Sequence, residues 1–204
     1  MHRMEEIMAK ELLVRSQVAK EDTWAIEDLY ASEELFLEDA HKLEKMIEEL
    51  EEYTESDLTT SSLHLLEYFK KLEKIAILLD RGLSYSQRNG DVDTANSYYQ
   101  ALNGKMMGIF HQYGTVTAPI DTWIASMEEE KIVQFYKEMP ELCNYKVTID
   151  DLRRLKEHTL SPEMEKLLAA SREMGTAVEK TYSLLADADF ENPMVADESG
   201  EMVK

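Results

Sequence analysis

The sequence contains only one cysteine, Cys143, among its 204 residues. A single thiol cannot form an intramolecular disulfide, and such sparing use of cysteine is typical of proteins in a reducing cytosol. Cys143 lies in the segment ELCNY, where no neighbouring side chain is a base that could activate it. The sequence therefore predicts a buried structural thiol rather than a nucleophile.

Long hydrophobic runs are also lacking. No stretch approaches the roughly 20 apolar residues that a membrane-spanning helix needs. The N-terminal segment MHRMEEIMAKELLVRS has no extended apolar run and no small-residue cleavage site, so it does not follow the pattern of a secretory signal. These features predict a cytoplasmic protein that has no membrane partner.

Positively charged residues are scarce. Lys and Arg number 22 against 42 Asp and Glu, which gives a formal net charge of -20. Because such a surface repels polyanions, the composition argues against binding of nucleic acid and of anionic membrane surfaces. The acidic surface can serve solubility, or it can attract cationic ligands, and the sequence leaves both interpretations open.

Proline and glycine are few, with 4 and 7 residues, while 44% of the residues are apolar. Few helix breakers favour helix over strand, and apolar residues recur at helical spacing over 33–53, 61–87 and 97–114. The range 97–114 is apolar on at least two sides, so we expect it at the centre of a bundle. Its Gly104 and Gly108 would let another helix approach closely. The predicted fold class is all-α, a multi-helix bundle-like lobe.

Glycines, prolines and one serine are predicted to mark the helix boundaries. Gly90 is expected to end the helix that begins near residue 61, Pro119 to break or kink the next one, and Gly175 to interrupt the last one. Ser161 is the expected N-cap of that last helix, because Pro162 follows at the first helical position.

The last segment, FENPMVADESGEMVK, changes character. It contains short apolar pairs on either side of a DESG turn signal, which predicts a short C-terminal β-hairpin. The expected organisation is therefore an N-terminal arm or short helix over 1–23, a helical domain over 24–189, and the hairpin over 190–204.

Motifs for catalysis and metal binding are absent from the sequence. The zinc-hydrolase motif HExxH needs two histidines four residues apart, and no two of the five histidines have that spacing. Glu38 and His41 form one Glu-x-x-His pair, whereas a di-iron bundle needs two. The segment with Asn89, Asp91 and Asp93 lacks the correctly placed glycine and the final glutamate of an EF-hand loop. The sequence thus predicts no catalytic, cofactor-binding or metal-binding residue in this chain.

Four stretches form an ordered set, namely TWAIEDLYASEE, DVDTANSYYQAL, HTLSPEMEKLLA and LLADADFENPMVADESGE. Each is a weak signal by itself. In their order and spacing they resemble the N-terminal region of oligoendopeptidase F, within the thimet-oligopeptidase-like zinc metallopeptidases. Together they span residues 24 to 201.

This resemblance implies a mainly helical protein with two lobes around a deep channel. Its catalytic half would carry the HExxH zinc site and a further Glu ligand, none of which has a counterpart here. The chain would then be the non-catalytic N-terminal lobe of a zinc metallopeptidase that hydrolyses short peptides, and it would wall the substrate channel. The implied partners are the missing catalytic domain of the same polypeptide, toward which the hairpin leads, and the oligopeptide substrate. Zinc would belong to the full-length parent.

An alternative of a different class is a free-standing acidic helical protein-interaction module. It would bind a partner through the Glu-rich face around residues 44–55 or through an aromatic stripe of Tyr98, Tyr99, Phe110 and Tyr113. Aromatic residues at this spacing more often belong to the core. The sequence by itself does not separate the two interpretations.

Overall fold

The structure, a computed structural model, describes residues 17–94, 96–186, 193–196, 198–200 and 202–203. The predicted all-α fold class is confirmed. The α-helices are α1 (Glu33–Glu48), α2 (Glu55–Thr60), α3 (Ser62–Val92), α4 (Ser97–Ser126), α5 (Glu129–Glu138), α6 (Lys146–Arg154) and α7 (Pro162–Leu184). Short 3-10 turns are found at Lys20–Asp22, Ile26–Asp28, Glu49–Glu52, Pro140–Tyr145 and Lys156–His158. None of the described helices is both long and apolar enough to cross a membrane.

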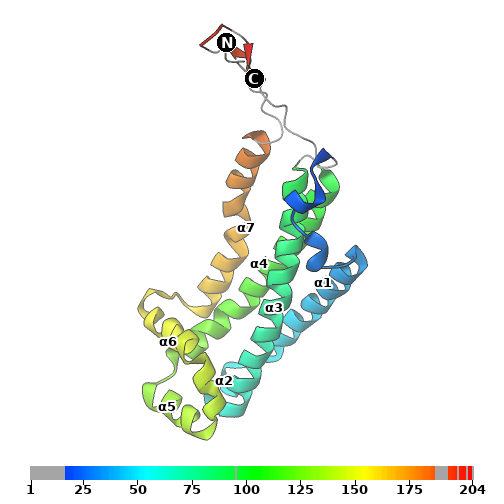
Figure 1. The fold of residues 1–204 in the computed structure, drawn as a ribbon. Coiled ribbons are helices and arrows are strands. Elements are labelled where there is room, and N and C mark those ends of the chain that lie inside the picture. Colours follow the sequence, from blue (N-terminus) through cyan, green and yellow to red (C-terminus); the bar gives the residue numbers. More distant parts are fainter. Residues whose placement is uncertain (1–16, 95, 187–192, 197, 201, 204) are drawn as a thin grey trace, which may run out of the picture.

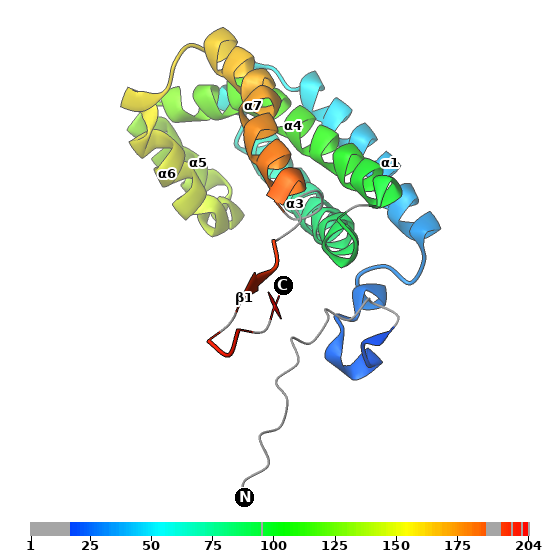
Figure 2. The ribbon, with the colours of Figure 1, turned by 90° about the horizontal axis from the view of Figure 1, so that it is seen from above.

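Helix α4 lies at the centre of the bundle, as the sequence predicts for the range 97–114. It contacts α1, α2, α3, α6 and α7. The two longest helices, α3 and α4, run antiparallel and side by side (Figure 1). Seen from above, α5 and α6 lie on one side of this pair and α1 lies on the other (Figure 2).

The hydrophobic core is formed where α1, α3, α4 and α5 meet. Its largest fully buried side chains include Phe36 and Leu43 of α1, Tyr68 of α3, Ile120 of α4 and Phe135 of α5. These residues are far apart in the sequence, so the core is a product of helix packing rather than of any one helix. Burying each such side chain contributes roughly 1.5–3 kcal/mol.

The segment before α1 is attached to the bundle through Tyr30, which belongs to the first of the four resembling stretches. Tyr30 is buried, and its hydroxyl donates a hydrogen bond to Asp39 Oδ2 at 3.0 Å. The Arg81 guanidinium of α3 lies 4.1 Å from the centre of the Tyr30 ring and donates to the same Asp39 oxygen. Tyr30 therefore links this segment to both α1 and α3.

A two-stranded antiparallel sheet follows the helices, as predicted. Strand β1 (Val195–Ala196) pairs with β2 (Met202–Val203), and Val195 lies opposite Val203. Gly200, in the turn between them, has a φ of 83°, which a side chain would strain. The domain division stays a prediction. Outside the described residues lie 1–16 of the expected arm, 95 and 187–189 of the expected helical domain, and 190–192, 197, 201 and 204 of the expected hairpin.

The predicted start of α7 is confirmed, but the predictions that Gly90 ends α3, that Pro119 breaks α4 and that Gly175 interrupts α7 are wrong. α7 begins at Pro162, and the Ser161 side chain accepts a hydrogen bond from Met164 N at 3.4 Å. However, Gly90 lies inside α3, Pro119 inside α4 and Gly175 inside α7. For α4 the physical reason is packing. Val116 and Ile120 flank the proline and are buried, so core contacts offset the hydrogen bond that Pro119 cannot donate.

Gly104 and Gly108 do not mark a close helix contact, contrary to the prediction. No heavy atom lies within 4 Å of a Cβ built at either position. Gly82 of α3 is the crowded glycine instead, because its Cβ would lie 2.7 Å from Met106 Cε.

This difference leads to a stability prediction for Gly104→Ala. Alanine is the better helix former and has open space here, so we expect the free energy of unfolding to rise by about 0.5–1 kcal/mol. Urea unfolding followed by circular dichroism measures the change. Gly82→Ala is the control and should gain less, because Met106 must move. A Gly104→Ala protein no more stable than the unmodified chain would contradict the prediction.

Candidate functional site

The residues that the sequence singled out for metal chemistry do not converge in the structure. Glu38 and His41 lie exposed on α1, and His41 Nδ1 is 3.3 Å from Glu44 Oε2 rather than paired with Glu38. Asn89 lies within the last turns of α3, where its Nδ2 donates to the Tyr85 carbonyl at 2.9 Å. These positions therefore act as helix-surface residues in the structure.

Cys143 is exposed, so the prediction of a buried thiol is wrong. It lies in the 3-10 turn Pro140–Tyr145, in which Leu142 is the buried residue. A turn of this kind directs neighbouring side chains to different sides, and the apolar position next to Cys143 is the one that reaches the core. Within the described parts of the chain, no group of three or more His, Cys, Asp or Glu side chains could hold a metal ion.

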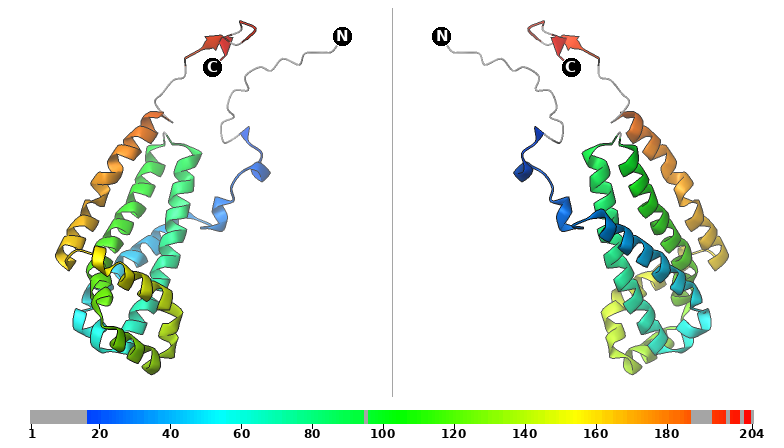
Figure 3. Two further views of the ribbon diagram at one scale, coloured as in Figure 1. Left: turned by 90° about the vertical axis from the view of Figure 1, so that its left-hand side faces the viewer. Right: turned by 90° about the vertical axis from the view of Figure 1, so that its right-hand side faces the viewer.

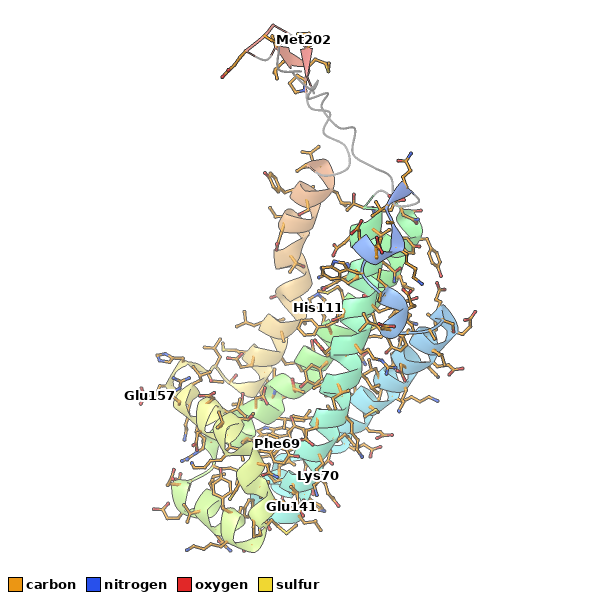
Figure 4. All side chains as sticks on the ribbon, viewed as in Figure 1. Phe69, Lys70, His111, Glu141, Glu157 and Met202 are labelled. Atoms are coloured by element: carbon orange, nitrogen blue, oxygen red, sulfur yellow. The ribbon has the colours of Figure 1, made fainter. Side chains whose placement is uncertain are left out.

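The structure does form a cleft of about 390 Å³ between α4, α6 and α7. Its polar lining includes His111 and Asp121 of α4 and Glu165 of α7, and its apolar lining includes Phe110 of α4 and Leu155, which follows α6. Figure 4 shows His111 on α4, on the side of that helix that faces α7. The cleft is a candidate site because aromatic, acidic and imidazole side chains meet there.

Among the acidic side chains of the cleft, Asp121 has the most strongly shifted pKa. Burial raises its pKa to about 7, because a desolvated carboxylate is less stable than its neutral form. Within the described residues, no hydrogen bond or ion pair is formed by its side chain to offset this cost. Asp121 is therefore close to half-ionised at neutral pH.

Two tyrosines share this environment. The Tyr68 hydroxyl is buried without a hydrogen-bond partner among the described atoms. Burial raises the pKa of Tyr68 well above its usual value, and the negative charge of Asp121 raises it further. The pKa of Tyr113, which lines the cleft, is raised for the same two reasons in the same order. Both phenols therefore stay protonated and remain hydrogen-bond donors at neutral pH.

The cleft offers an imidazole, two carboxyl groups and several hydroxyls to a ligand. The buried Nδ1 of His111 has no partner among the described atoms, and Glu165 Oε1 accepts a hydrogen bond from Leu160 N at 2.8 Å. The hydroxyls of Thr122 and Thr159 donate to carbonyls of their own helical turns. The arrangement suits a group that carries positive charge or donates hydrogen bonds.

Sequence reasoning missed Asp121, although a signal was present. It is the only Asp, Glu, Lys or Arg between Lys105 and Glu128. A lone acid in a very apolar central helix is either strained or functional, because charged side chains are rarely buried unless paired. The other cleft residues carry no comparable signal.

Comparison with known proteins gives consistent matches. A family model described as Oligopeptidase F matches residues 123–191. Oligopeptidase PepF of Bacillus subtilis (strain 168) is 35% identical over 196 residues, which cover 96% of this chain and 29% of that protein. An oligoendopeptidase F homolog of Lactococcus lactis subsp. lactis (strain IL1403) is 26% identical, over 93% of this chain and 32% of its own length.

The fold agrees with these matches. The crystal structure of oligoendopeptidase-F from Enterococcus faecium has a TM-score of 0.76 to this structure at 26% identity, covering 84% of this chain and 33% of that chain. The chain therefore spans about a third of the length of its curated relatives. By both sequence and fold, this chain belongs to the oligoendopeptidase F family and corresponds to its N-terminal region.

Proposed function

We propose that this chain is the non-catalytic N-terminal lobe of a cytoplasmic zinc oligopeptidase, and that it walls the channel through which short peptides reach the active site. The match to Oligopeptidase PepF over 96% of this chain, but only 29% of that protein, carries the proposal. A match of this kind assigns the chain to one part of a larger peptidase. The lobe would comprise residues 24–189, and the segment 190–204 would lead toward the catalytic domain.

Zinc chemistry in such an enzyme would belong to the remainder of the protein. The motif HExxH does not occur anywhere in the 204 residues, and the described residues offer no group of three ligands. Zinc, when bound, would activate the attacking water. The contribution of this chain would be shape, exclusion of large substrates and attraction of peptides with basic residues by its net charge of -20.

We predict that the isolated 204-residue chain hydrolyses no peptide, with or without added zinc, because its sequence lacks the HExxH motif that would supply two zinc ligands and the general base for water activation. Cleavage of a quenched fluorescent heptapeptide by the purified chain measures this. The Bacillus subtilis relative, assayed in parallel, is the positive control. Chelator-sensitive cleavage by the chain alone would contradict the prediction.

The proposal for the whole protein has a separate test. The source gene, read beyond codon 204, is expected to encode several hundred further residues that include HExxH and a downstream Glu. A stop codon after Lys204, or a continuation without HExxH, would contradict the proposal and favour a free-standing acidic interaction module.

A further inference from the structure

Helix α7 exposes an unusual number of large apolar side chains. Leu167 is 71% exposed, Met174 80% and Val178 76%. Four more residues of the same segment are also exposed apolar residues: Met164, Leu168, Tyr182 and Leu185. Soluble proteins rarely expose contiguous apolar surface of this extent unless the surface binds something.

These seven residues form a single stripe. At 3.6 residues per turn, they fall within an arc of about 120° around the axis of α7. The sequence places no Asp, Glu, Lys or Arg within that arc; Ser171 and Gly175 are its only other members inside the helix. We call these seven residues the α7 stripe.

The α7 stripe points away from the bundle. α7 is the outermost helix of its layer and packs beside α4 (Figure 3). Ala169, its buried apolar residue, and Glu165, which lines the cleft, lie on the opposite side of the helix axis from Leu167 and Val178. An amphipathic helix in a complete domain turns its apolar face inward. Here the apolar face has no cover among the described residues.

We propose that the α7 stripe is the surface on which the remainder of the polypeptide packs, and that it joins this lobe to the catalytic domain. This inference rests on the proposed function. The observation that favours this occupant is length: the chain covers 33% of the Enterococcus faecium structure it resembles, so about two thirds of such a protein lies outside it. The hairpin that follows α7 in the sequence is apolar and exposed as well, at Met194, Val195 and Met202.

Charge argues against a second copy of this chain as the occupant. Around the axis of α7, Glu163 lies next to one edge of the α7 stripe and Glu179 lies next to the other edge. A second copy would bring these acids against each other and would add another chain with a net charge of -20. The surface instead fits a partner with an apolar groove, which accepts side chains at helical spacing, and with basic residues at its rim.

Thiol labelling provides the test. In a Cys143→Ser background, Val178→Cys places a probe in the α7 stripe, and Val147→Cys places one on α6. The two valines are a matched pair, 76% and 75% exposed. Each variant is prepared as the 204-residue chain and as the longer polypeptide that the gene encodes, and the rate of reaction with a maleimide dye is measured without substrate.

We expect the cysteine at 178 to react at least about tenfold more slowly in the longer polypeptide than in the 204-residue chain, because packing protects buried groups. The cysteine at 147 should react at similar rates in both. Equal reaction rates for the cysteine at 178 in the two proteins would overturn the inference. Protection of this cysteine in the 204-residue chain that increases with protein concentration would also overturn it, because a second copy of the chain would then be the occupant.

The labelling readout separates this inference from the proposed function. A longer polypeptide that protects position 178 but cleaves no peptide would support the inference and contradict the peptidase function. An active peptidase in which position 178 stays reactive would support the peptidase function and contradict the inference.

Discussion

Asp121→Asn is expected to raise the free energy of unfolding by about 3 kcal/mol at pH 8. Burial raises the pKa of Asp121 from its ordinary value of 3.8 to about 7, and a tenfold change in a proton-binding constant corresponds to about 1.4 kcal/mol. Water in the partly open cleft screens the carboxylate and reduces this cost. Asparagine has nearly the same shape and carries no charge, so it avoids the cost of an ionised carboxylate in this place.

The sign of the pH dependence follows from proton binding. Between about pH 4 and pH 7 the folded chain keeps the Asp121 proton, whereas the unfolded chain has lost it. The contribution of Asp121 to the free energy of unfolding is therefore most favourable below about pH 4, and this favourable contribution is lost as the pH rises through about 7. We expect the gain from Asp121→Asn to be only about 1 kcal/mol at pH 5.

Urea unfolding at pH 5 and at pH 8, followed by circular dichroism, measures both values. Asp151→Asn is the control: this carboxylate lies on the surface of α6, 3.0 Å from Arg154 Nη2. Its loss should change stability by less than about 1 kcal/mol at either pH. If Asp121→Asn and the unmodified chain lost stability equally between pH 5 and pH 8, the pKa of Asp121 would not be raised as we describe.

Leu43→Ala is expected to lower the free energy of unfolding by about 3 kcal/mol, with a range of about 2–5. Leu43 is 1% exposed on α1 and belongs to the core formed with α3 and α4. Truncation removes buried apolar surface and leaves a cavity that the surrounding helices fill only in part.

Leu35→Ala provides a matched control on the same helix. Leu35 is 47% exposed, so its truncation should change the free energy of unfolding by no more than about 0.5 kcal/mol. Thermal and urea unfolding of the two variants measure the contrast. Similar losses in both proteins would mean that the packing of α1 differs from the one described.

The position of Leu35 illustrates what helical periodicity leaves undecided. The sequence groups Leu35 with Leu43, Ile47 and Leu50 on one face, and the structure buries the last three. It buries Phe36 in place of Leu35. Around the helix axis, Phe36 lies between Leu43 and Ile47, whereas Leu35 lies about 80° or more from both. The contact of α1 with α3 and α4 therefore centres on Phe36 and leaves Leu35 at the exposed edge of the apolar face.

The candidate cleft was beyond prediction for a related reason. Its lining comes from α4, from the region around Leu155 and from α7, which are separated in the sequence by tens of residues. Only the unusual isolation of Asp121 in an apolar helix was visible in advance. The packing of α3 and α7 against α4 determines which side chains lie near Asp121.

The sequence by itself determined the helical class, the central place of the range 97–114, the start of α7 at Ser161 and Pro162, and the family. These properties depend on composition, local capping and apolar periodicity, which act within one helix. Only the tertiary structure decided that Asp121 is half-buried in the cleft without a partner among the described residues, that Cys143 is exposed and that the apolar stripe of α7 faces away from α4. Those outcomes depend on contacts between helices distant in the chain, where the burial of one face fixes the exposure of another.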